Sequence, residues 1–239
     1  RVMAQIVYYW WAAIHFGNGK EGVEFSVPSG NFGNIFAGYG SHLMGLDISQ
    51  FIVGTNQNAV LDRFFQSGSM VATDVIPTLS PSMDIQIPSN FERLLFEMYQ
   101  RDGQRVKETL KEFRRSGELR ITQAELEDLQ LKWTSARVDD DATLQTIADT
   151  YSLTGELVDP HTAVGIAAGK AKRSSENIPL ICLGTAQPGK FPEAVKKATG
   201  ITPKLPSHLE DLYSRSEHFS VLPNDLQMVK KHIQNTVKD

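Results

Sequence analysis

The sequence has 239 residues, of which 41% are hydrophobic and 22% are charged, and its formal net charge is −4. A chain of this length and apolar content can bury the core of one large domain or two small ones. Its basic residues are scattered and its net charge is negative, which argues against a nucleic-acid partner. The most apolar stretch, residues 3–16, is shorter than the roughly 18 residues that a membrane span needs, so we expect no membrane partner.

The chain opens inside a helix-like segment. Ile6, Tyr9, Trp10 and Ala13 recur at helical spacing, which predicts an amphipathic helix. The first residue is Arg1 instead of methionine, and the apolar part has no preceding charged region and no cleavage site, so we expect no secretory signal. An amphipathic helix at the very start of a chain predicts that the natural polypeptide begins further upstream.

Strand-like apolar runs alternate with helix-like segments along much of the chain. Most of the runs are followed by a turn containing glycine or proline and then by helix-like sequence. This alternation predicts an α/β fold with a parallel sheet flanked by helices. The predicted strands are residues 23–27, 51–55, 156–158 and 180–184. The predicted helices include residues 34–44, 59–66, 91–99 and 160–171, a segment from Phe191 onward, and the solvated tail segments 209–213 and 224–237.

Residues 101–151 have a different character, because strand-like runs disappear and polar, helix-favouring sequence takes over. Thr122 and Glu125 have the spacing of a capping box, and a further helix is expected from Thr143. Basic and acidic side chains alternate over residues 101–115. This alternation favours a solvated helix face over a phosphate or nucleic-acid patch. We therefore predict a helical insertion packed beside the sheet.

Residues 23–38 carry the most informative pattern, a strand followed by a turn of small residues and a helix that begins near Asn34. This order directs main-chain N–H groups and the positive end of a helix dipole at one spot, as phosphate sites do. We expect Gly30 and Gly33 to permit positive φ and close ligand approach. We also expect Asn31 and Asn34 to tolerate left-handed backbone and to donate side-chain amides. The glycine spacing alone is explained equally well by an ordinary tight turn.

Residues 29–34, with the sequence Ser-Gly-Asn-Phe-Gly-Asn, resemble the phosphate loop of threonine synthases. That family consists of enzymes dependent on pyridoxal 5′-phosphate (PLP) and belongs to the tryptophan-synthase-β-like fold group. The family more usually has histidine where Gln187 stands, so the role of that imidazole is open here. Three further segments agree in chain order and extend the resemblance from Arg1 to Ala194: residues 83–86 with 89–95, residues 159–163, and residues 185–188 with 190–194.

The resemblance implies how PLP would be bound. The hydroxyl of Thr185 would face the pyridine nitrogen of the cofactor, and a neutral group there leaves that nitrogen largely unprotonated. Without the resemblance, Thr185 is better explained as a helix N-cap before Pro188. The groups that would hold the cofactor phosphate belong to Gly30, Asn31, Phe32, Gly33 and Asn34.

Substrate contacts are implied at Arg1, which falls where the family has an arginine for the substrate phosphate, and at His161. A surface histidine in a capping turn explains His161 about as well. The resemblance matches no lysine of this chain to the one that forms the Schiff base, so we expect that catalytic residue in the missing N-terminal half of the polypeptide. Cys182 lies in an apolar run and is interpreted as a buried strand cysteine instead of a nucleophile. A lone thiol fits a reducing, cytoplasmic setting.

The activity implied by the resemblance is the conversion of O-phospho-L-homoserine and water to L-threonine and phosphate, with PLP as cofactor and no metal. Residues 1–100 would form part of a PLP-binding α/β domain, residues 101–152 the helical insertion, and residues 153–239 the rest of the domain with C-terminal helices. One rival is a dehydratase or cysteine synthase of the same fold group, against which residues 89–93 and the insertion argue. A second rival is a non-catalytic phosphate-binding derivative.

Overall fold

The computed structural model describes residues 1–17, 19 and 22–237. It divides into two compact units, Arg1–Lys204 and Leu205–Asp239. No helix within the described ranges is long and apolar enough to cross a bilayer.

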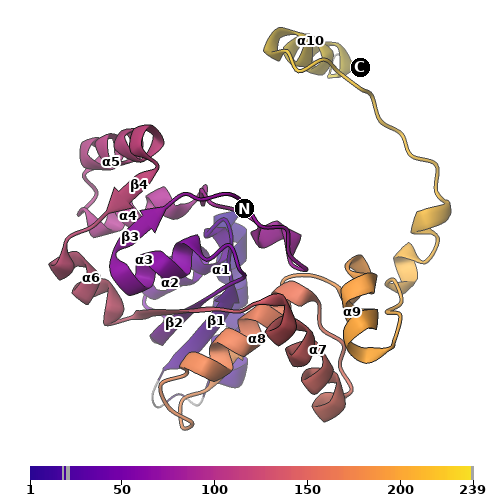
Figure 1. The fold of residues 1–239 in the computed structure, drawn as a ribbon, viewed down its shortest axis with the longest axis horizontal. Helices are drawn as coiled ribbons and strands as arrows, with labels where there is room; N and C mark the ends of the chain where they lie inside the picture. The colour runs from indigo at the N-terminus through magenta and orange to yellow at the C-terminus, as the bar shows by residue number, and fades with distance from the viewer. Residues whose placement is uncertain (18, 20–21, 238–239) are drawn as a thin grey trace. The chain divides into compact units, whose positions relative to one another are not determined.

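The larger unit is built on a four-stranded parallel sheet in the order β5-β2-β1-β6, whose central strands β1 and β2 are labelled in Figure 1. The two central strands are almost entirely buried, as parallel strands covered on both faces usually are. The predicted parallel α/β fold is therefore confirmed, and three of the four predicted strands are present. The strands of the sheet are β1 (Val23–Pro28), β2 (Ile48–Thr55), β5 (Trp133–Arg137) and β6 (Leu180–Cys182).

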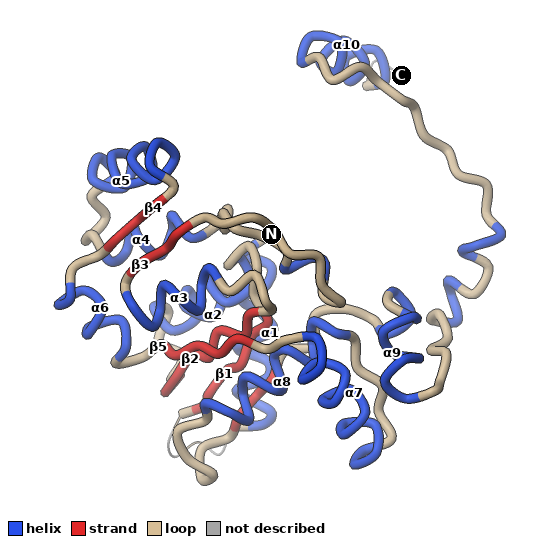
Figure 2. The backbone as a smooth tube through the Cα atoms, viewed as in Figure 1, coloured by secondary structure: helices blue, strands red, loops and turns tan. Residues whose placement is uncertain are grey.

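Helices cover both faces of this sheet (Figure 2). Side chains of β2 alternate between the faces: Phe51 and Val53 lie in the larger core, whereas Ile52 packs with residues of α8. The helices of the unit are α1 (Val2–Phe16), α2 (Gly33–Leu43), α3 (Val60–Ser67), α4 (Phe91–Met98), α5 (Gly103–Ser116), α6 (Gln123–Gln130), α7 (Asp140–Thr154), α8 (Pro160–Lys172) and α9 (Pro192–Thr199).

Two strand predictions are wrong. Residues 156–158 form an irregular connection with no sheet partner, because they lie between the end of α7 and the cap of α8. Strands are also present within residues 101–151: β5 joins the sheet beside β2, and β4 (Glu118–Arg120) pairs with β3 (Ser69–Val71) in an antiparallel ribbon. The sequence of β5 is largely polar, and its buried Ser135 donates a hydrogen bond to Asp62 Oδ1 at 2.7 Å. The division at residues 100 and 152 stays a prediction.

The predicted helix starts are mostly confirmed. Thr122 and Glu125 form the capping box that opens α6, and Asp159 caps α8 ahead of Pro160. The helix expected from Thr143 begins three residues earlier, because the Asp139 carboxylate accepts the Ala142 N–H at 2.9 Å and caps it.

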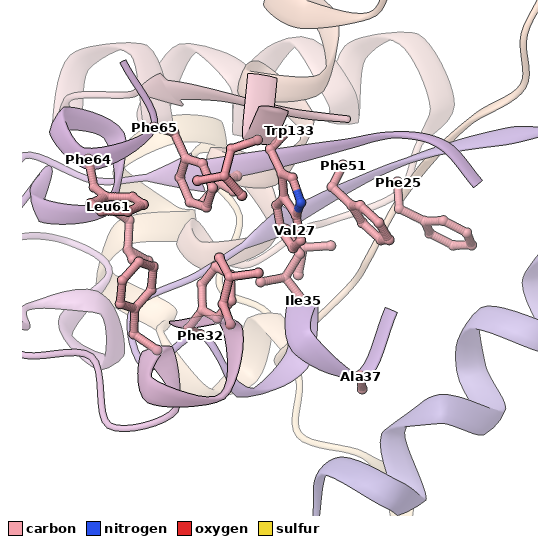
Figure 3. Close-up of a cluster of buried hydrophobic side chains, with 14 of the residues drawn as sticks. Phe25, Val27, Phe32, Ile35, Ala37, Phe51, Leu61, Phe64, Phe65 and Trp133 are labelled. Carbon is pink, nitrogen blue, oxygen red and sulfur yellow. The ribbon is translucent and has the colours of Figure 1, made fainter. Parts of the chain in front are cut away.

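An aromatic cluster fills the larger core (Figure 3). The Trp133 ring stacks on Phe51 and Phe65, with centroids 4.6 and 5.3 Å away. Phe32, from the turn after β1, stacks on the same indole at 5.6 Å and on Phe65 at 6.0 Å. Such ring pairs add about 0.5–1.5 kcal/mol each beyond area burial. The turn before α2 is therefore anchored in the hydrophobic core.

The smaller unit consists of two short 3₁₀ turns, Ser207–Leu209 and Leu212–Ser214, and the helix α10 (Leu226–Thr236). None of the described residues in these elements is buried. The solvated helix predicted for residues 224–237 is confirmed, and the segment 209–213 contains 3₁₀ turns instead of an α-helix.

Candidate functional site

The turn between β1 and α2 has one left-handed residue, and it is Phe32, with φ of 64°. Gly30 and Gly33 do not have positive φ, so the prediction that they supply it is wrong. The expectation of left-handed backbone at Asn31 and Asn34 is wrong too. A left-handed residue with a side chain costs about 1–2 kcal/mol. The buried ring stacks of Phe32 offset that cost, which explains why an aromatic residue holds this position.

The two glycines are instead required by the close approach of a second loop. A Cβ on Gly30 would lie 2.9 Å from Met83 Cα and 3.0 Å from the Ser82 carbonyl oxygen, both main-chain atoms. A Cβ on Gly33 would lie 3.1 Å from Asn90 Nδ2. The segment 80–90 therefore closes over the turn: its main chain leaves no room for a side chain at Gly30, and at Gly33 the Asn90 side chain would have to shift.

The start of α2 has no side-chain cap. The first N–H groups of a helix have no partner within it, and the helix dipole favours negative charge at that end. The Ser29 N–H is used by the Gly54 carbonyl at 2.8 Å, so the donors that face outward are those of the residues that follow. This geometry agrees with the predicted phosphate site.

The two asparagines of the turn connect it to its neighbours. The Asn31 carbonyl accepts the Asn90 N–H at 3.1 Å and the Asn90 side-chain amide at 3.0 Å, and Asn31 Oδ1 accepts the Ser89 hydroxyl at 3.1 Å. The Tyr9 hydroxyl donates to the Asn34 carbonyl at 2.9 Å and to Asn34 Oδ1 at 3.1 Å. Burial raises the pKa of Tyr9 well above its usual value, so this donor keeps its proton. Both amide oxygens are thus engaged, which orients the amide nitrogens.

Asp84 holds the second loop in place. Its Oδ1 accepts hydrogen bonds from the Asn56 and Asn58 amides at 2.8 and 2.9 Å and from the Thr78 hydroxyl at 2.7 Å. Its Oδ2 accepts the Thr78 N–H at 3.0 Å. A carboxylate that accepts several hydrogen bonds stabilises the loop strongly. This network fixes the part of the loop that includes Ser82.

A third wall comes from the start of α8 and the segment after β6. His161 is 4% exposed, so the alternative of a surface histidine is wrong. Its Nδ1 lies 2.8 Å from Asp159 Oδ1, and its Nε2 accepts the Ser82 N–H at 3.2 Å. Thr185 is exposed, and its N–H donates to the Thr162 hydroxyl at 3.1 Å. The 3₁₀ turn Pro188–Lys190 is preceded by Gln187 with no side-chain cap, so Thr185 is not its N-cap.

These elements enclose a cavity of about 620 Å³ at the carboxyl ends of β1 and β6. Ligands of open α/β sheets bind at such an edge, and the volume is typical of small-molecule sites. Every predicted site residue lines this cavity: Arg1, Gly30, Asn31, Phe32, Gly33, Asn34, His161 and Thr185. Lining residues to which the sequence predictions assigned no role include Gln5, Tyr8, Ser82, Met83, Ser89, Asn90 and Lys190.

The charge of the cavity is positive. Arg1 and Lys190 line it, and no aspartate or glutamate is among the described residues that do. Gln187 lies outside this lining. The arrangement of an uncapped helix start and two cationic side chains can bind anionic groups.

Cys182 lies at the end of β6, as its apolar run predicted, but the residue is half-buried instead of buried. Burial raises the pKa of its thiol to about 11, so the thiolate is scarce at neutral pH. Cys182 is thus unsuited to be a nucleophile.

Comparisons with known proteins agree with this geometry. Residues 162–233 match the family model described as threonine synthase, C-terminal. The threonine synthase of Pseudomonas aeruginosa is 49% identical over 98% of this chain, and that of Saccharomyces cerevisiae is 36% identical over 98%. The chain spans about half the length of these curated relatives.

Solved structures give the same result. The structure of PLP-bound threonine synthase from Brucella melitensis superposes with a TM-score of 0.92 at 43% identity, covering 100% of this chain and 51% of that one. Yeast threonine synthase gives 0.88 at 36% identity, with 99% of this chain and 52% of that one covered. A threonine deaminase from Solanum lycopersicum, at 14% identity and 0.51, shares the fold alone, over 83% of this chain and 47% of that one. By sequence and by fold, the chain corresponds to the C-terminal half of threonine synthases.

Proposed function

We propose that this chain supplies the cofactor-phosphate side of a threonine synthase active site. The reaction would convert O-phospho-L-homoserine and water to L-threonine and phosphate with PLP as cofactor. The observation that carries the proposal is the uncapped start of α2, which opens into the same cavity as Arg1, His161 and Thr185. The relatives named threonine synthase, one of them PLP-bound, support the choice of cofactor and reaction.

The residues of the cavity fit PLP. Its phosphate would take the main-chain donors at the start of α2, where the dipole favours an anion and no carboxylate competes. Thr185 would present a neutral hydroxyl to the pyridine nitrogen from the opposite wall. The bound cofactor supplies the electron sink that stabilises a carbanion at the substrate. The phosphate ligands would be Gly30, Asn31, Phe32, Gly33 and Asn34.

A second anion has to be bound in this reaction, the phosphate that leaves the substrate. Arg1 would hold it through a bidentate guanidinium contact, for which arginine is well suited. Lys190 lines the same cavity and adds positive charge. His161 stays a predicted substrate contact, restricted to its carbon edge because both ring nitrogens are engaged within the protein.

The lysine that carries the cofactor would come from the other half of the polypeptide, which is the proposed partner of this chain. We place the enzyme in the cytoplasm, in keeping with a single unpaired cysteine.

The test compares this chain with the complete product of its gene. The complete product with PLP should release phosphate from O-phospho-L-homoserine and form threonine, whereas residues 1–239 alone should form none. Threonine production by the 239-residue chain would contradict the assignment of the catalytic lysine to the other half. A complete product that forms a keto acid from serine or threonine, and no threonine from O-phospho-L-homoserine, would favour a dehydratase.

A further inference from the structure

We infer that Asp159 is a positioning residue that holds two walls of the cavity at once, one with each carboxylate oxygen. Its side chain is fully buried at the start of α8, and it does not line the cavity itself. An ordinary N-cap aspartate satisfies helix N–H groups and nothing more. Asp159 does this, since it accepts the N–H groups of His161 and Thr162, and it also receives both side chains of those residues.

The first oxygen, Oδ1, acts through His161. A main-chain N–H can only donate, so the Ser82 N–H at 3.2 Å requires Nε2 of His161 to be an acceptor. The ring proton therefore sits on Nδ1, where it is donated to Asp159 Oδ1 at 2.8 Å. Ser82 belongs to the loop whose carbonyl lies against Gly30. Asp159 Oδ1 thus sets the tautomer of His161 and, through it, the position of the wall above the phosphate loop.

The second oxygen, Oδ2, acts through Thr162. The Thr185 N–H donates to the Thr162 hydroxyl oxygen at 3.1 Å, and the hydroxyl proton is donated in turn to Asp159 Oδ2. Thr162 is only 7% exposed, so water does not readily replace its hydroxyl as the partner of the Thr185 N–H. Asp159 Oδ2 thus sets the position of the segment that carries Thr185. Both chains of donors end on one carboxylate, and the two walls they hold face the same cavity.

Asp159→Asn is the sharpest variant, because it keeps the shape of the side chain and one oxygen that can cap the helix. The other carboxylate oxygen becomes an amide NH₂, which cannot accept the hydrogen bond from His161 or from Thr162. The matched control is Asp139→Asn, at the exposed cap of α7. The Asp139 side chain accepts the Ala142 N–H, and among the described residues it neither lines the cavity nor bonds to a residue that does. Asparagine and aspartate cap helices about equally well. A residue that only caps would therefore give the same result at both positions.

The experiment uses the complete gene product and reads three signals. These are the ¹⁵N resonances of the His161 ring, assigned with His161→Gln, the Thr185 amide resonance, and the dissociation constant for PLP. In Asp159→Asn we expect the ring to lose its Nδ1–H tautomer or the Thr185 amide to shift, and PLP to bind roughly tenfold more weakly or worse. Asp139→Asn should leave all three signals as they are. An unchanged ring, amide and affinity in folded Asp159→Asn would overturn the inference.

A single-arm pair covers the case in which Asp159→Asn does not fold. Thr162→Val removes only the hydroxyl that links the Thr185 N–H to Asp159 Oδ2, so it should shift the Thr185 amide resonance and weaken PLP binding. Thr162→Ser keeps the hydroxyl, so its amide resonance and its PLP affinity should stay close to those of the unaltered protein. An equal loss in the valine and serine variants would overturn the inference. The inference about Asp159 rests on the proposed function only for the PLP signal. If the unaltered protein bound no PLP, the proposed function would fail, but the His161 ring and Thr185 amide resonances would still decide the role of Asp159.

Discussion

Among the helices that begin at the cavity, α8 and α2 have opposite N-termini: the start of α8 is capped by a side chain and the start of α2 is not. The start of α8 is capped by the carboxylate of Asp159, which accepts the N–H groups of His161 and Thr162. The start of α2 follows Phe32 and has no side-chain cap. Both starts lie among the residues that line one cavity, so they share the same surroundings.

The difference shows that a helix start does not by itself make an anion site. Each α-helix has unpaired N–H groups and a favourable dipole at its first turn. At α8 these are consumed by a buried carboxylate, which would also repel a phosphate. At α2 they remain for a ligand, and the glycines beside them keep side chains out of the way. The missing cap at α2, together with the glycines beside it, is therefore what supports the proposed anion site at this helix start.

The largest effect is expected from Gly30→Ala. The added methyl group would lie 2.9 Å from the main chain of Met83, where neither partner can rotate away. Overpacking of this kind costs about 1–3 kcal/mol and would move the second loop off the turn. We expect a lower melting temperature and loss of most PLP affinity in the complete gene product. Gly40→Ala is the control, since its Cβ would meet only Ile6 Cδ1 at 3.5 Å; equal losses in both variants would refute the close-approach explanation.

Asn34→Asp should make the start of α2 resemble that of α8. The carboxylate keeps the shape of the amide but adds a negative charge in the first turn, which stabilises a helix by about 0.3–1 kcal/mol. The same charge repels a phosphate. We therefore expect PLP to bind at least roughly tenfold more weakly while the melting temperature of the ligand-free protein stays the same or rises. A fall in both, measured by PLP titration and calorimetry, would show that Asn34 matters only for stability.

Gly33→Val should weaken PLP binding far more than Thr185→Ser does. The valine side chain would meet the Asn90 amide, since even its Cβ lies 3.1 Å from Nδ2, and it would crowd the space proposed for the phosphate. Serine at 185 keeps the hydroxyl and loses one methyl group, worth about 1 kcal/mol of burial at most. Titration of ligand-free protein with PLP ranks the two. A weaker Thr185→Ser variant would contradict the proposed placement of the phosphate and the pyridine ring.

The smallest effect concerns Cys182, at the end of β6 and away from both helix starts. The pKa of this thiol is about 11 in the folded protein and near its ordinary value of 9.0 in the unfolded chain, so the unfolded chain loses the proton first. This contribution to stability is complete below pH 9 and is lost as the pH rises from 9 to 11. The difference between the free energies of unfolding of the chain and of Cys182→Ser, measured with urea, should change with pH between 9 and 11 and stay constant below that range. A difference that stays constant through that range as well would mean that packing, and not ionisation, distinguishes the two.

The same contrast explains what the sequence could predict. The cap at Asp159, the small-residue turn and the apolar strands β1 and β2 depend on neighbours in the chain, and they were predictable from local pattern. The strand β5 was not, because its buried Ser135 finds its hydrogen-bond partner 73 positions away, in Asp62. The left-handed Phe32 was not either, since only the distant rings of the core make that conformation affordable.

The candidate site follows this division. The phosphate loop, Thr185 and His161 were singled out from motifs, whereas Ser82 and Asn90 acquire their place from a loop that closes over the turn. The positive φ was expected at the wrong residues, because glycine satisfies two different demands, and the sequence does not distinguish conformational freedom from lack of space.

Phe32 also has a consequence for protein design. Its backbone forms the turn that precedes α2, and its ring lies between Phe65, Phe91 and Trp133 in the core. Six residues copied onto another sheet would therefore bring the sequence of the turn without the surface that shapes it. The smallest portable unit is the turn together with the three rings that hold it, drawn from three separate parts of the chain.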